Sequence, residues 1–158
     1  MAYNRIVHEL PTDPGTFRER LAERFDLEQG ADPTPGEKGR IAIYLDGAWW
    51  GMKLPETEGD TVAARLDVAR LSEFVLEPLL DVTDVRRDEN IDFVGGIRGT
   101  GELEDRVDRG GAEMAISMYP TDIGELVAVA EAGELMPPKS TWFEPKLRSG
   151  LLVHLFDV

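Results

Sequence analysis

The stretch from residue 136 to residue 156 contains the side chains in this sequence best suited to bind a ligand. It reads MPPKSTWFEPKLRSGLLVHLF. Between residues 137 and 151 it has three basic residues against one acid, a net charge of +2 in a chain of −14, so the remainder carries −16. A proline-stiffened loop with cations, hydroxyl groups and an aromatic ring is suited to an anion such as a phosphate or carboxylate. The candidate ligand-binding residues are Lys139, Ser140, Thr141, Trp142, Lys146 and Arg148.

The same loop also has a purely structural interpretation. Trp142 and Phe143 could pack on the core while the cations pair with the acidic surface. Replacing Lys139 and Arg148 with alanine separates the two interpretations. Loss of ligand binding at unchanged stability favours a binding loop, and a large loss of stability favours a packing role.

A second, weaker candidate is the glycine-rich segment GGIRGTGE at residues 95–102. A loop between a strand and a helix can hold a phosphate with its backbone N–H groups, which here would involve Gly96, Arg98 and Gly99. The spacing matches neither the P-loop nor the dinucleotide fingerprint. Glu102 and Glu104 also follow where an anion would meet the helix start. An ordinary glycine turn is therefore the favoured alternative.

Other chemistry finds little support in the sequence. The chain has no cysteine, and its two histidines, His8 and His154, are far apart, with His154 inside an apolar run. Nothing in their spacing indicates a metal site. No Gly-x-Ser-x-Gly elbow and no distinctive carboxylate pair occurs. The sequence therefore predicts no metal and no cofactor, and it leaves any catalytic residue unknown.

The charge of the chain restricts its partners. With 17 basic and 31 acidic residues, its surface repels nucleic-acid phosphates and anionic lipids, so neither nucleic acid nor membrane is predicted as a partner. The N-terminus lacks a secretory signal pattern, which makes the cytoplasm the expected location. Thirteen arginines against four lysines, with so many acids, fit either salt adaptation or a GC-rich genome.

Alternating apolar residues and turn signals predict the strands, and helical spacing with capping residues predicts the helices. Asp46-Gly47 suits a tight hairpin turn, and the adjacent Trp49 and Trp50 should lie on opposite faces of the sheet. Strands are expected at 3–9, 41–54 (a hairpin), 91–96, 112–120 and 150–158. Helices are expected at 14–25, 67–79 (ending near Pro78), 101–109 and 122–132.

These elements interleave along 158 residues, which is the length of a single domain, here 1–158. The predicted class is α/β or α+β. It has a mixed β-sheet with a hairpin near 41–54, covered by about four helices.

Four segments in this order resemble the C-terminal part of the domain-of-unknown-function family 1015. They are LDVARLSEFVLEPLL (66–80), IDFVGG (91–96), AISMYPTDIGELVAVAEAGE (115–134) and PPKSTWFEPKLRSG (137–150). The resemblance covers nearly the whole chain. It implies a longer protein, whose N-terminal part contains an Asp-Gly-His-His-Arg stretch similar to the ParB-like superfamily, which includes nucleotide-dependent kinases of free serine. That stretch is not in this sequence.

The resemblance therefore predicts a C-terminal accessory or substrate-contacting domain of a larger protein that is not catalytic alone. Its partners would be an N-terminal domain or separately encoded polypeptide and a small anionic metabolite. The alternative is part of a phosphoryl-transfer enzyme of the ParB-like kinase type, acting on a small metabolite such as serine or phosphoserine. A third interpretation, a stand-alone interaction module, rests on the short length and the tryptophan pair.

Overall fold

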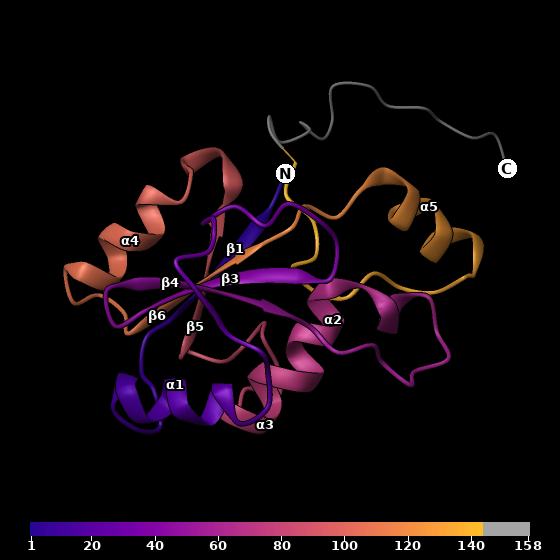
Figure 1. Ribbon diagram of the computed structural model, residues 1–158. Coiled ribbons are helices and arrows are strands. Elements are labelled where there is room, and N and C mark those ends of the chain that lie inside the picture. The colour runs from indigo at the N-terminus through magenta and orange to yellow at the C-terminus, as the bar shows by residue number, and fades with distance from the viewer. Residues whose placement is uncertain (144–158) are drawn as a thin grey trace, which may run out of the picture.

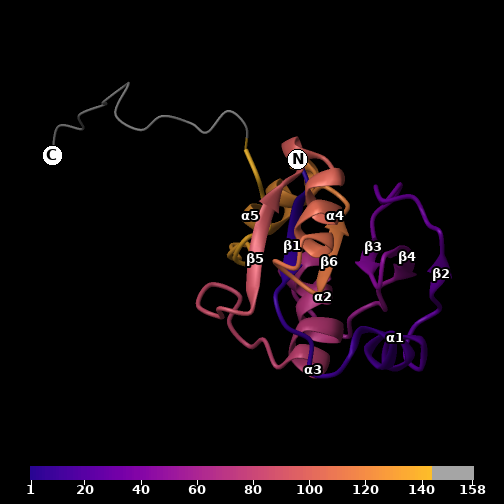
Figure 2. The same cartoon turned by 90° about the vertical axis from the view of Figure 1, so that its left-hand side faces the viewer.

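The fold is built on one six-stranded sheet with the strand order β2-β4-β3-β6-β1-β5. The computed structural model describes residues 1–143 (Figure 1). Figure 2 shows the strands side by side, from β5 at one edge to β2 at the other. The strands are β1 (Tyr3–Val7), β2 (Glu28–Gln29), β3 (Arg40–Leu45), β4 (Ala48–Lys53), β5 (Ile91–Gly95) and β6 (Met114–Met118).

Helices cover both faces of this sheet, and α2, η2 and α3 form one continuous helical run (Figure 1). Within residues 1–143 this run, α1, α4 and α5 make up the four main helical units. The α-helices are α1 (Pro14–Ala22), α2 (Asp67–Leu71), α3 (Glu77–Leu80), α4 (Gly101–Asp108) and α5 (Ile123–Glu131). The other helical turns are η1 (Ala63–Arg65), η2 (Ser72–Leu76, a π-helix) and η3 (Gly96–Arg98). None of the helices in the described part is long and apolar enough to cross a membrane.

The strand pleat divides the core into two layers. The larger layer joins one sheet face to α1, to the α2–α3 run and to Val129 of α5. The smaller layer joins the other face to Leu103 and Val107 of α4. Successive strand residues point to opposite faces, so β3 contributes Ile41 and Ile43 to the first layer and Ala42 to the second.

The predicted α+β class and the hairpin are confirmed, but the sheet is antiparallel at every pairing between the described strands rather than mixed. The order of the strands explains this difference. β5 and β6 run in the same direction and are joined through α4, yet β1 lies between them and pairs antiparallel with both. This split arrangement of a β-α-β unit separates the two parallel strands.

The helical run predicted to end near Pro78 continues two residues further, to Leu80. The wide π-turn of η2 precedes Pro78, and the Glu77 N–H reaches back to the Ser72 carbonyl. A proline inside a helix removes one N–H and crowds the preceding turn. Local widening of the helix accommodates this disruption.

Candidate functional site

Part of the ligand-binding loop predicted from the sequence lies against β1 and β5, and we call residues 139–142 the covering segment. Nη2 of Arg5 donates a hydrogen bond to the Lys139 carbonyl at 2.9 Å. The Thr121 hydroxyl donates to the Ser140 carbonyl at 2.8 Å. The N-terminal amino group donates to the Trp142 carbonyl at 3.3 Å. Three hydrogen bonds from distant parts of the chain thus hold the backbone of this segment.

Trp142 anchors the covering segment to strand β5. Its indole ring lies against Gly95, where an added Cβ would come within 2.5 Å of the ring. The ring also meets Tyr3 edge-on, with the ring centroids 5.1 Å apart. Close approach of the indole requires glycine at residue 95. Two segments that carry the family resemblance, 91–96 and 137–150, therefore meet at this contact.

Lys139 is the exposed cation of the covering segment. Its backbone has φ of 59°, a left-handed conformation that is uncommon for a residue with a Cβ. Its ammonium lies 4.9 Å from the centroid of the Phe93 ring. No carboxylate among residues 1–143 forms an ion pair with it. Lys139 is exposed to solvent, whereas the neighbouring Ser140 is buried.

Arg5 is the functional candidate that sequence reasoning missed. Its side chain is only 2% exposed, beneath the covering segment. Besides Lys139 it donates to the Tyr3 carbonyl, and its guanidinium carbon lies 5.7 Å from the Tyr3 ring centroid and 5.2 Å from that of Phe93. Burial lowers the pKa of Arg5 to about 10. Within the described residues its Nε has no hydrogen-bond partner, and no carboxylate pairs with it.

A sequence signal for Arg5 did exist. In a strand, residues two apart share a face. Arg5 therefore points to the same side as Val7, which is completely buried. An arginine at a buried position of a strand indicates a charge that needs hydrogen-bond acceptors or an opposite charge, because burying it alone is costly.

A groove of about 180 Å³ opens beside the covering segment. The predicted ligand residues Thr141 and Trp142 line one side of it. Ile123 and Phe143, 78% and 56% exposed, make its rim apolar. Two hydroxyls and one carboxylate supply its polar groups. The full lining is Met1, Thr121, Asp122, Ile123, Leu126, Thr141, Trp142 and Phe143.

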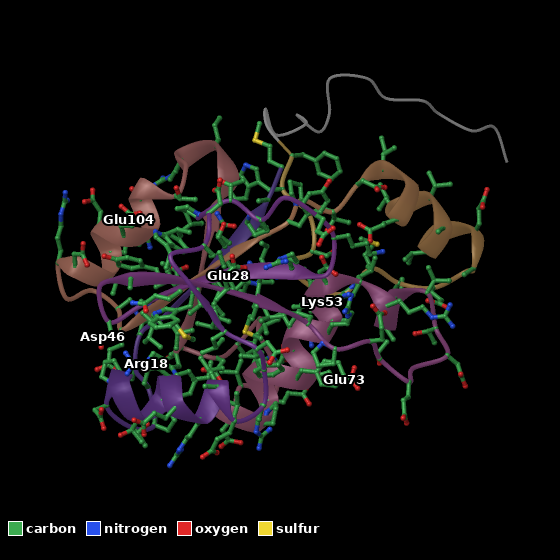
Figure 3. All side chains as sticks on the ribbon, viewed as in Figure 1. Arg18, Glu28, Asp46, Lys53, Glu73 and Glu104 are labelled. Carbon is green, nitrogen blue, oxygen red and sulfur yellow. The ribbon has the colours of Figure 1, made fainter. Side chains whose placement is uncertain are left out.

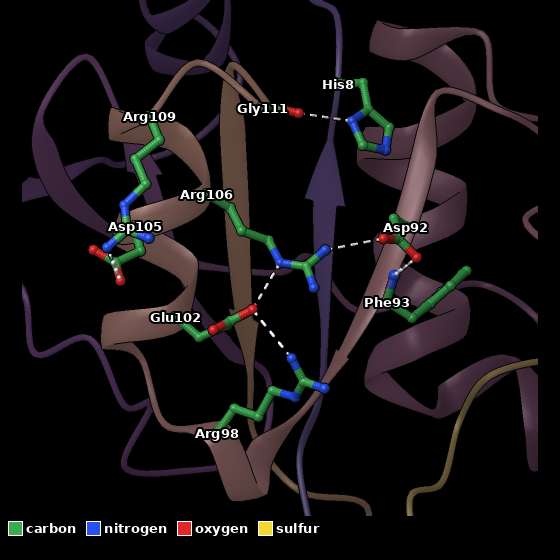
Figure 4. Close-up of polar contacts among 9 residues, drawn as sticks. All are labelled: His8, Asp92, Phe93, Arg98, Glu102, Asp105, Arg106, Arg109 and Gly111. Carbon is green, nitrogen blue, oxygen red and sulfur yellow. Dashed lines mark hydrogen bonds and ion pairs between the residues drawn. The ribbon is translucent and has the colours of Figure 1, made fainter.

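The glycine-rich candidate loop forms its hydrogen bonds and its ion pair with other residues of this chain. The Gly96 N–H donates to the Ala2 carbonyl at 2.8 Å, and the Gly99 N–H donates to the Gly96 carbonyl at 3.1 Å. Arg98 lies 3.3 Å from Glu102, which also accepts a hydrogen bond from Arg106 (Figure 4). These contacts are those of a glycine turn. A phosphate at Gly96, Arg98 and Gly99 stays a prediction.

The remaining sequence candidates lie apart from the covering segment. His8 makes a hydrogen bond through Nδ1 to the Gly111 carbonyl at 2.9 Å (Figure 4). Among residues 1–143 no group of three or more His, Cys, Asp or Glu side chains could hold a metal ion. Lys146, Arg148, His154 and the predicted strand 150–158 lie outside the described residues.

The two adjacent tryptophans lie on opposite faces of the sheet, as predicted. Trp49 donates from Nε1 to Glu104 of α4 at 2.6 Å. Trp50 instead lies under Arg18 of α1, whose guanidinium carbon is 5.3 Å from the ring centroid. Figure 3 labels Arg18 and Glu104 on opposite sides of the sheet. Both tryptophans are covered by helices of this chain, so the exposed apolar surface at the groove is the better candidate for contact with a ligand.

The covering segment, Arg5 and the groove thus form the candidate site. No family model, no curated protein sequence and no solved structure matches this chain.

Proposed function

We propose that this chain is a substrate-contacting accessory domain of a larger protein, and that the covering segment and its groove contact a small anionic metabolite. The proposal is carried by one observation. The loop chosen from its composition forms a wall of the groove, and its exposed cation, Lys139, has no carboxylate partner within residues 1–143. The Lys139 ammonium lies over the Phe93 ring and is exposed, a position from which it can bind an anion from outside the domain.

The proposal assigns catalysis to another part. An N-terminal domain or a separately encoded polypeptide would supply it, as the resemblance to family 1015 implies. We place the protein in the cytoplasm, a reducing compartment that suits a chain without cysteine.

A second candidate function is a contribution to phosphoryl transfer of the ParB-like kinase type, on serine or phosphoserine. The covering segment favours it, because it is bonded to the cation Arg5 and to the hydroxyl group of Thr121, and phosphate recognition uses positive charge together with hydrogen-bond donors. Phosphoserine should then bind better than serine.

A titration of the isotope-labelled full chain with phosphoserine, followed by NMR, tests the proposed function. We expect saturable shifts of the Thr121 and Thr141 amides, weakened in Lys139→Ala. Lys53→Ala is the matched control, since Lys53 is an exposed lysine on β4, three strands away from β1. Absence of saturable shifts with both phosphoserine and serine, or equal weakening in the two variants, would overturn the proposal.

A further inference from the structure

We infer that Arg5 is a buried receptor for a single oxyanion, a carboxylate or a phosphate, which it binds through Nε–H and through Nη2 once the oxyanion replaces the Lys139 carbonyl there. This inference rests on the proposed function and names the chemical group of the ligand that the site recognises. It starts from the absence of a carboxylate partner for Arg5 among residues 1–143.

Arg70 is the second buried arginine of the described residues, and unlike Arg5 it has a carboxylate partner. Arg70 is 3% exposed and lies 3.3 Å from the carboxylate of Asp67, which is itself buried. It also donates from Nε to the Pro55 carbonyl at 2.8 Å. An isolated buried charge is costly, and proteins normally pair it. Arg5, in contrast, has no acid beside it among residues 1–143.

The guanidinium of Arg5 retains the donors that an oxyanion requires. A guanidinium has five N–H groups. The hydrogen bonds to the Tyr3 and Lys139 carbonyls come from Nη1 and Nη2, and Nε has no partner among the described residues. Nε–H and one Nη–H form the side-on fork that carboxylates and phosphates accept in two parallel hydrogen bonds.

The surroundings hold this fork in place and add a second charge. The rings of Tyr3 and Phe93 lie within cation–π distance of the guanidinium, which limits its rotation. Lys139 approaches the same Phe93 ring, so its ammonium and the Arg5 guanidinium carbon are at most 10.1 Å apart, the two centroid distances together.

The covering segment controls access to Arg5. It is held there by the Arg5–Lys139 and Thr121–Ser140 hydrogen bonds, and Lys139 occupies the left-handed conformation. A non-glycine residue with positive φ persists only where its surroundings hold it. An oxyanion that replaced the Lys139 carbonyl on Nη2 would release this residue. The segment would then open next to the groove, whose hydroxyl-bearing and apolar lining suits the short body of such a ligand.

The test observes Arg5 directly, through the NMR signal of its Nε–H group in the full chain. The probes are inorganic phosphate, acetate and phosphoserine, and the phosphate and acetate arms identify which oxyanion the fork prefers. We expect a saturable shift of this signal. Arg5→Lys keeps the charge but loses the fork, so affinity should fall at least about tenfold, as expected for loss of one charge-assisted hydrogen bond.

Arg109→Lys is the matched control, because Arg109 is exposed, follows the end of α4 and pairs with Asp105 outside the site. It should leave affinity unchanged. If phosphoserine shifts the groove amides but not the Arg5 Nε–H signal, the inference is wrong while the proposed function stands. If no probe shifts either, both are wrong. Because the signal is read in the unaltered chain, the test holds even if Arg5→Lys fails to fold.

Discussion

Replacing each of the two buried arginines with methionine should have very different effects on the free energy of unfolding. Arg5→Met should change it by less than about 1 kcal/mol, whereas Arg70→Met should lower it by about 3–5 kcal/mol, the range for breaking a buried ion pair. The two arginines are almost equally buried, at 2% and 3% exposed. They differ in their acid partner, because among the described residues Arg70 pairs with Asp67 whereas Arg5 pairs with no carboxylate.

The magnitude for Arg5 follows from two opposing contributions. Burial lowers the pKa of Arg5 to about 10, and at about 1.4 kcal/mol per pKa unit the charged form costs about 3 kcal/mol. Methionine removes that cost. It also removes two charge-assisted hydrogen bonds, worth about 1.5–3 kcal/mol each. The lower value applies because their acceptors belong to half-buried Tyr3 and exposed Lys139, where water can replace the donor. The two contributions nearly cancel.

Arg70 lacks this compensation. Methionine at residue 70 would leave the buried Asp67 carboxylate without its cation, and burial already raises the pKa of Asp67. The carbonyls of Leu54 and Pro55 would lose their donors as well. Urea denaturation followed by far-UV circular dichroism measures both variants. If Arg5→Met is destabilised as much as Arg70→Met, Arg5 is a structural anchor and the reasoning for an oxyanion receptor fails.

Three further predictions concern single contacts. Gly95→Ala should displace Trp142, change its fluorescence and cost about 1–3 kcal/mol, as overpacking does; unchanged fluorescence would contradict the tight contact. Asp122→Ala removes the carboxylate that accepts from the Glu125 N–H in the α5 capping box and should cost about 1 kcal/mol in urea denaturation. The Asp84 carboxylate, whose pKa Arg86 lowers to about 2, contributes stability above its ordinary pKa that is lost as pH falls through 2. In Arg86→Ala its NMR titration midpoint should rise toward 3.8.

Signals that act over a few residues predicted much of the fold. Asp46 and Gly47 both adopt positive φ, as the tight hairpin turn requires. Asp13 caps α1 through the Thr16 N–H, and Asp122 with Glu125 forms the predicted capping box. In each case the interacting groups are at most three residues apart, so the sequence itself contains the geometry.

The strand order could not be predicted in this way. β1 comes first in the chain but lies between β6 and β5, and its partners are about ninety and one hundred and ten residues away. Hydrophobic patterns show that a strand has a buried face, but they do not identify its neighbours. The antiparallel sheet and the position of Arg5 both depend on this long-range choice. Arg5 meets Lys139 across 134 residues.

The ligand-binding and the structural interpretations of the loop apply to different residues of the covering segment. Trp142 fulfils the structural interpretation, because its indole occupies the space over Gly95 and contacts Tyr3. Lys139 does not, since among the described residues no acid of this very acidic chain pairs with it. Packing therefore explains the aromatic residue of the motif and the glycine opposite it. Lys139 has the Phe93 ring as its described partner, and binding of a negatively charged ligand by Lys139 and Arg5 stays a proposal.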